Sequence, residues 1–253
     1  MASSWAQLGS AFERPIDMSA LLKANDITVD VQRHLVNVYA ALAATILSCA
    51  LGAVVGLRVP AGGLLTTLAG FGALVWLRVD PDKTNRAKRT SILVLFGFLQ
   101  GLGLAGLVDI VLEVDASILV TALLATTTVF LCFAGAALFS KRRSYLYLGG
   151  VLSTGILVLL SASLLSLFVR AEFLFNLQLY AGLAIFCGYV IYDTQVIVEK
   201  ASLGDRDFAW HAVTLFVDFI AIFVRVCIIL LRNREGGDRR ERRANPTGRT
   251  YRR

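Results

Sequence analysis

The chain has 253 residues, of which 57% are hydrophobic and only 17% are charged, whereas a soluble domain carries about 25% charged residues. With a mean hydropathy of +0.69, it has too little polar surface to cover a soluble core, so composition indicates one membrane domain of bundled helices. The net charge of +7 belongs almost entirely to residues 232–253, where nine arginines oppose three acids. This local excess gives no basis for a nucleic-acid-binding protein.

Residues 1–34 are mixed and amphipathic, without the basic start, short apolar run and cleavage site of a signal peptide. The first apolar run after it is therefore expected to be an uncleaved anchor, and the charges of the later loops predict that residues 1–34 are cytosolic. Seven continuous apolar runs follow, at 35–57, 61–78, 91–108, 116–139, 145–169, 173–198 and 209–231. Most reach the ~20 residues that a bilayer requires, and the second is at the short limit.

These runs predict an all-α, seven-helix transmembrane bundle over residues 35–231. Two small-residue pairs, Gly52/Gly56 and Gly97/Gly101, favour close packing between helices. Residues 232–253 have almost no apolar content, and Gly236-Gly237 and Pro246 are expected to interrupt any helix. We therefore predict a basic, disordered C-terminal tail over 232–253.

Loop charge predicts the orientation of the bundle. The loop at 78–90 carries five bases and the loop at 141–143 carries three, so both should be cytosolic. The acidic turn at 109–115 should then face the other side. Seven full crossings would also place the basic tail on that other side, against the positive-inside rule. Either the last segment turns back, or a late tail has little influence on topology, and the sequence leaves both open.

Two acids, Asp193 and Asp218, lie inside the sixth and seventh apolar runs. Each costs about 2.5–3.5 kcal/mol at a helix centre, so neither is there for stability. Asp193 is ~9 Å from the end of its helix and Asp218 is ~14 Å into the next, at 1.5 Å per residue. Because a short loop makes these helices antiparallel neighbours, the carboxylates can face each other. An acid paired with a base for packing specificity is the alternative.

Two carboxylates that close cannot both stay ionised cheaply, so they are expected to share a proton. When both ionise, they would repel each other or attract a hard cation such as Ca²⁺. Arg78 ends the second run on the same side, where its guanidinium could reach the pair or snorkel to headgroups. His211 and Arg225 lie seven residues before and after Asp218, on one helical stripe that should face the bundle.

Several segments in the same order along the chain closely resemble those of Bax inhibitor-1 proteins, the transmembrane Bax-inhibitor-motif family. They are His34-Leu35 with Val38-Tyr39, 75–77 (Val-Trp-Leu), 192–195 (Tyr-Asp-Thr-Gln), Glu199-Lys200, 204–211 (Gly-Asp-Arg-Asp-Phe-Ala-Trp-His), 215–219 (Leu-Phe-Val-Asp-Phe) and Phe223. The segments at 115–119 and 145–150 look particularly like those of plant and algal members. The resemblance covers nearly the whole chain.

The resemblance implies a seven-helix bundle with the last helix near the centre, in the endoplasmic reticulum membrane. It implies a calcium leak sensitive to pH and suppression of programmed cell death, with calcium and protons as the ions concerned and no cofactor. In bacterial relatives an aspartate pair forms the pH-sensing latch, and Asp193 and Asp218 match it. An arginine that joins the latch there is matched by Arg78. Charged tails of eukaryotic relatives imply calmodulin or cell-death regulators as partners for 232–253, although this tail is richer in arginine than theirs. Its arginines should also hold anionic membrane lipid if the tail is cytosolic.

Two other classes of function remain open on the sequence alone. An intramembrane aspartyl protease also carries Tyr-Asp on helix 6, as in Tyr192-Asp193, but its second aspartate follows Gly-x-Gly. Here Leu215-Phe216-Val217 precedes Asp218, and these bulky residues argue against approach of a substrate backbone. We therefore expect no enzyme. A non-conducting regulator that acts only through protein partners is the stronger alternative.

Overall fold

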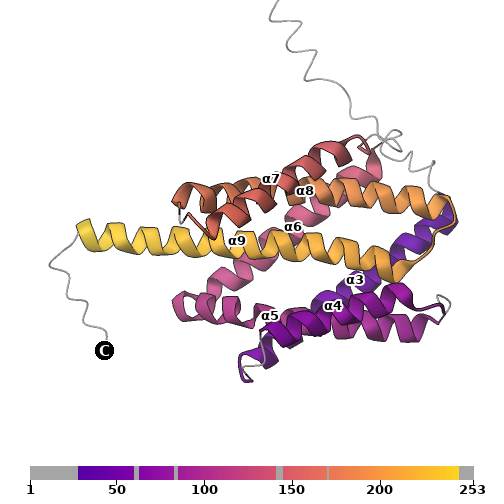
Figure 1. Ribbon diagram of the computed structural model, residues 1–253, viewed down its shortest axis with the longest axis horizontal. Coiled ribbons are helices and arrows are strands. Elements are labelled where there is room, and N and C mark those ends of the chain that lie inside the picture. The colour runs from indigo at the N-terminus through magenta and orange to yellow at the C-terminus, as the bar shows by residue number, and fades with distance from the viewer. Residues whose placement is uncertain (1–27, 60–62, 83–84, 141–144, 170, 245–253) are drawn as a thin grey trace, which may run out of the picture.

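The computed structural model describes residues 28–59, 63–82, 85–140, 145–169 and 171–244, and this part of the chain is helical with connecting turns (Figure 1). The described residues form seven helices, as predicted. They are α3 (Val29–Gly56), α4 (Leu64–Val79), α5 (Arg86–Val114), α6 (Ala116–Phe139), α7 (Leu148–Ser166), α8 (Glu172–Ser202) and α9 (Phe208–Ala244).

Six of these seven helices are long and apolar enough to cross a membrane, counted over the described residues. The exception is α4, whose 16 residues extend only ~24 Å against a hydrocarbon core of ~30 Å. The sequence prediction of a short second segment is therefore correct. The chain is a multi-pass helical membrane protein.

The structure moves two predicted boundaries. Helix α3 begins at Val29, so the last residues of the predicted N-terminal segment 1–34 are helical; residues 1–27 lie outside the described part. Helix α9 continues through Gly236 and Gly237 to Ala244, so the prediction that these glycines interrupt the helix is wrong. A helical glycine costs only about 1 kcal/mol relative to alanine, and the flanking arginines and glutamates are good helix formers. Residues 245–253, with Pro246, lie outside the described part.

Helix α9 occupies the centre of the bundle. It packs against α3, α4, α5, α6 and α8, and Figure 1 shows it running between the α7–α8 pair and the α3–α5 group. Two edge-to-face aromatic pairs fix it there: Phe216 on Phe96 of α5, with ring centroids 5.5 Å apart, and Phe219 on Phe130 of α6, at 5.6 Å. The predicted central position of the last helix is confirmed.

Helices α3 and α5 approach each other closely at their glycines. A methyl group added at Gly101 would lie 2.0 Å from the Cys49 carbonyl oxygen, and one at Gly52 would lie 2.1 Å from that of Phe98. No side chain fits at these distances. The predicted small-residue pairs therefore form the α3–α5 seam.

Helix α9 crosses the whole bundle. Near its far end, Arg232 contacts Glu172 at the start of α8, and Arg234 contacts Asp115 in the α5–α6 turn, both at 3.1 Å. The Ser117 N–H, and more weakly Arg234, lower the pKa of the Asp115 carboxyl from its ordinary value. The basic stretch therefore begins at the end opposite the 78–90 loop, and the possibility that the last segment turns back does not apply to residues up to 244.

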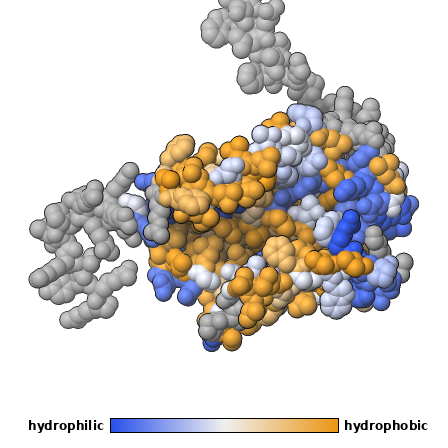
Figure 2. Space-filling view, in the orientation of Figure 1, coloured by the Kyte–Doolittle hydropathy of each residue, from blue (hydrophilic) through white to orange (hydrophobic). Residues whose placement is uncertain are grey.

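The outer surface agrees with a membrane-spanning body. Figure 2 shows apolar side chains over the middle of the molecule, while hydrophilic ones gather toward its ends, most of all where α9 begins. We call the end that holds the start of α9 and the 78–90 loop the basic-loop end. The opposite end holds Asp115, Glu172 and the Arg232–Arg234 region.

Candidate functional site

The structure brings Asp193 of α8 and Asp218 of α9 together. Their carboxyl groups lie within hydrogen-bonding reach of each other. Asp218 is only 3% exposed, and Asp193 is half-buried. Both residues lie inside helices that span the membrane by length and composition.

The turn between α8 and α9 sets this pairing. It reverses the chain in five residues, with Gly204 at φ 97°, a left-handed conformation that favours glycine. The Asp205 N–H donates to the Lys200 carbonyl (2.9 Å), and the Asp207 carboxylate accepts from the Trp210 N–H (3.1 Å) to cap α9. Two antiparallel helices leaving so tight a turn hold side chains of similar depth opposite each other.

No base neutralises the pair by direct contact. Among the described residues, no lysine, arginine or histidine forms an ion pair with Asp193 or Asp218; Lys200 acts on Asp193 only as a nearby charge. Asp218 Oδ2 is buried and accepts no hydrogen bond from a donor of the protein. A proton held between the two carboxyl groups is the arrangement that satisfies these oxygens at the least cost. The alternative of an acid paired with a base for packing is therefore not what the structure contains.

Arg78 lies elsewhere. It is exposed at the end of α4, with its guanidinium carbon 5.2 Å from the centre of the Trp210 ring. Trp210 precedes Asp218 by eight residues, or ~12 Å along α9. The structure therefore places Arg78 near the membrane edge and not at the carboxyl pair.

His211 and Arg225 face the bundle as their spacing predicts, but each meets a different neighbour. His211 is buried, with Nδ1 2.9 Å from Nε2 of His34 on α3, so one ring must donate to the other. Arg225 is half-buried, its guanidinium 4.5 Å from the Phe186 ring centre, and it donates to the Ala221 carbonyl (2.8 Å). Neither residue contacts Asp218.

Sequence reasoning missed a buried ion pair at the basic-loop end. Arg89 of α5 is 1% exposed and donates to Asp207, with Nη2 and Oδ1 2.5 Å apart. By position in the sequence, Arg89 is one of the five bases of the 78–90 loop. The signal that could have found it is spacing: Leu93 and Phe96, four and seven residues later, are both core residues on the same helical face.

The described residues hold no group of three or more His, Cys, Asp or Glu side chains that could bind a metal ion. Calcium takes six to eight oxygen ligands, and Asp193 with Asp218 supplies at most four. Asp193 and Asp218 alone therefore do not complete a calcium coordination shell.

The chain matches known proteins over most of its length. The family described as "Inhibitor of apoptosis-promoting Bax1" matches residues 31–235. "Probable Bax inhibitor 1" of Paralichthys olivaceus is 42% identical over 227 residues, covering 88% of this chain and 96% of the relative. "Bax inhibitor 1" of Sus scrofa is 41% identical over 225 residues, covering 88% and 95%. The protein of the same name from Arabidopsis thaliana is 41% identical over 215 residues, covering 85% and 87%. The chain therefore belongs to the Bax inhibitor family.

Proposed function

We propose that this protein suppresses programmed cell death as a pH-sensitive calcium leak of the endoplasmic reticulum membrane, gated by Asp193 and Asp218. Family membership supports an apoptosis-suppressing membrane protein. The leak, its pH sensitivity and its compartment are the further steps of the proposal. They rest on the resemblance of the chain and on the chemistry of the carboxyl pair.

The observation that carries the proposal is a carboxyl pair within the membrane-spanning helices that none of the described bases contacts. Holding one proton, the pair ties α8 to α9 by a hydrogen bond. Losing that proton leaves two like charges in close contact, which repel each other and attract a divalent cation. The same titration therefore changes both the contact between the helices and the affinity of the site for calcium.

Calcium and protons are the ions in this proposal, and no cofactor or nucleotide takes part. Calcium passes down its gradient, because a carboxyl latch can admit an ion but cannot drive it uphill. In sealed vesicles without nucleotide the flux should therefore proceed at its full rate.

The test is calcium flux through the purified protein in liposomes that contain a calcium-sensitive dye. We expect the parental rate to change between roughly pH 6 and 8, where perturbed carboxylates titrate. Asp193→Asn and Asp218→Asn should each flatten this profile, because a neutral amide keeps the shape and loses the titration. Asp109→Asn, which changes an exposed acid on α5, is the matched control and should keep the parental profile.

Three outcomes would contradict the proposal in different ways. A parental pH profile in both amide variants would remove the pair from gating. The absence of flux at every pH, from protein that is folded and still protects cells, would favour a non-conducting regulator. A strict requirement for ATP would exclude a passive leak.

A further inference from the structure

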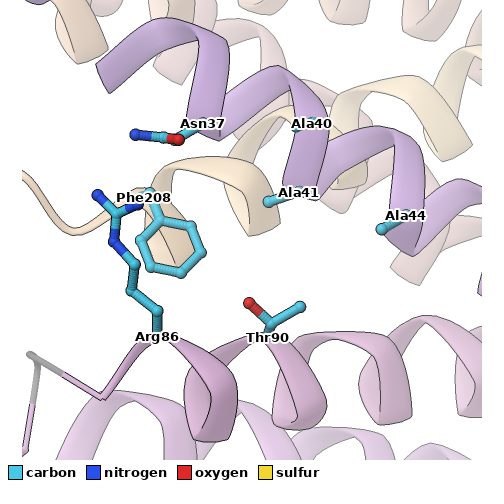
Figure 3. A pocket seen from close by; sticks show the side chains of 7 residues that line it. All are labelled: Asn37, Ala40, Ala41, Ala44, Arg86, Thr90 and Phe208. Carbon is cyan, nitrogen blue, oxygen red and sulfur yellow. The ribbon is translucent and has the colours of Figure 1, made fainter. Parts of the chain in front are cut away.

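A groove runs along the membrane-facing side of the α3–α5 seam, away from the carboxyl pair. The part of the groove nearest the basic-loop end is a pocket of about 250 Å³, shown in Figure 3. It is lined by Asn37, Ala40, Ala41 and Ala44 of α3, Arg86 and Thr90 of α5, and Phe208 of α9. Arg86 and Phe208 begin their helices, and Asn37 lies near the start of the predicted membrane segment of α3. The pocket is therefore at the level of the lipid headgroups.

The groove continues from this pocket toward the membrane interior. Thr90 also lines a second, shallower depression of about 520 Å³, whose α3 wall is Ser48 and Leu51. Positions 37, 41, 44, 48 and 51 recur every three or four residues, so they share one face of α3, and position 40 lies beside that face. From Asn37 to Leu51 this face extends about 21 Å, which exceeds the ~15 Å of hydrocarbon in one leaflet.

Of the residues that line the pocket at the basic-loop end, Arg86 alone is charged. Three acids at this end are already in ion pairs: Asp30 with Arg206, Asp80 with Lys88, and Asp207 with Arg89. Among the described residues, Arg86 has no ion pair, and its guanidinium carbon lies 5.9 Å from the Phe208 ring centre. Figure 3 shows its side chain rising beside that ring toward the α3 wall. The guanidinium therefore lies at the edge of the pocket, and no described carboxylate forms an ion pair with it.

We propose that this groove binds one anionic phospholipid, with the phosphate on Arg86 and an acyl chain along the small residues of α3. A guanidinium fork matches two phosphate oxygens, and the Asn37 amide and the Thr90 hydroxyl border the same pocket. Farther from the basic-loop end, the small side chains of Ala40 and Ala44 leave a groove that an acyl chain fills. This site is separate from the arginine-rich 232–253 segment, which starts at the other end of the bundle, and it does not depend on the proposed calcium leak.

The test is lipid binding to the full-length protein in detergent, measured by native mass spectrometry. Phosphatidylserine and phosphatidylcholine with identical chains are the two probes. We expect phosphatidylserine to bind more tightly, and Arg86→Gln to weaken it about fivefold, the effect of one base near an anionic headgroup. Ala44→Leu fills the part of the groove that holds the acyl chain, so it should weaken the binding of both lipids. Glycerophosphoserine, which has the headgroup but no chains, should not displace the lipid.

Matched controls separate this site from general surface charge. Arg58→Gln removes an exposed arginine at the other end of α3, and Ala136→Leu adds the same bulk to an exposed position on α6. Both keep the arginine-rich tail, so both should bind phosphatidylserine as the parent does. An equal loss in Arg58→Gln and Arg86→Gln would reduce the effect to surface charge and overturn the site. Parental binding by both Arg86→Gln and Ala44→Leu, with melting temperatures unchanged, would overturn it as well.

Discussion

Charged residues inside this bundle are accommodated in three ways. Arg89 and Asp207 neutralise each other in a buried ion pair. Arg225 lies over an aromatic ring and donates to a backbone carbonyl of its own helix. Asp193 and Asp218 lie within hydrogen-bonding reach of each other, and no base of the described residues forms an ion pair with either. The first two arrangements keep a fixed charge, whereas the charge of the carboxyl pair depends on whether it holds a proton.

The Arg89–Asp207 pair gives a prediction about stability. Arg89→Gln should lower the free energy of unfolding by roughly 3–5 kcal/mol, because it leaves the buried Asp207 carboxylate without its partner. Arg206→Gln breaks the Arg206–Asp30 pair, whose side chains are 55% and 60% exposed, and should cost less than about 1 kcal/mol. Thermal unfolding of both variants in the same detergent measures the difference. Equal melting temperatures for the two variants would show that the buried pair contributes no special stability.

The contacts of the candidate site residues are predictable from sequence to the extent that they depend on local spacing. The pairing of Asp193 with Asp218 follows from two acids in apolar runs joined by a short loop. The contact between His34 and His211 joins residues 177 positions apart, and no spacing rule relates α3 to α9. Arg78 was predicted near the pair because it ends a helix on the correct side. Its actual partner, Trp210, depends on the rotation of α4 against α9, which the apolar pattern does not specify.

At the scale of the elements, the α3 and α5 backbones lie so close together that the α3–α5 seam has no room for side chains at its glycines. Gly101→Ala would place a methyl group 2.0 Å from the Cys49 carbonyl oxygen, which is rigid helical backbone. The helices must separate, at a cost typical of overpacking, about 1–3 kcal/mol. Gly103→Ala, two residues along α5, meets nothing within 4 Å and should be neutral or slightly stabilising, because alanine is the better helix former.

Size-exclusion profiles after stepwise heating in detergent measure this pair of variants. Only Gly101→Ala should lose its monodisperse peak at a lower temperature. A melting point for Gly101→Ala at or above that of Gly103→Ala would mean that the α3–α5 seam yields readily.

Helix boundaries show where element prediction succeeds and fails. Each apolar run predicts a helix, because a spanning segment must satisfy its backbone hydrogen bonds internally. Hydropathy does not report where such a helix ends once it leaves the bilayer. Helix α9 therefore extends through Gly236 and Gly237, and α3 begins within the polar stretch before its apolar run. Apolar content locates the membrane segment, whereas helix propensity and end contacts locate the termini.

At the scale of the whole molecule, α9 joins the basic-loop end of the bundle to the opposite end, which holds Asp115 and Glu172. From Phe208 to Gly236 it extends about 42 Å, more than a hydrocarbon core of ~30 Å. The Arg234–Asp115 ion pair then joins α9 at Arg234 to the α5–α6 turn. If the 78–90 loop is cytosolic, the basic tail starts on the opposite side of the membrane. There calmodulin, a cytosolic partner, cannot reach it. A cytosolic 78–90 loop and calmodulin binding to the tail therefore exclude each other, and the topology of α9 decides between them.

Cysteine labelling in sealed vesicles tests this topology directly. Asp205 and Glu235 are exposed and lie at opposite ends of α9, so Asp205→Cys and Glu235→Cys, each in a background without the four native cysteines, report the two ends. We expect a membrane-impermeant maleimide to label one variant in intact vesicles and the other only after permeabilisation. The positive-inside rule predicts Asp205 on the cytosolic side. Labelling of both variants from the same side would mean that α9 does not cross the membrane, and calmodulin binding to the tail would again be possible. Reciprocal labelling would confine any partner of the tail to the side opposite the 78–90 loop.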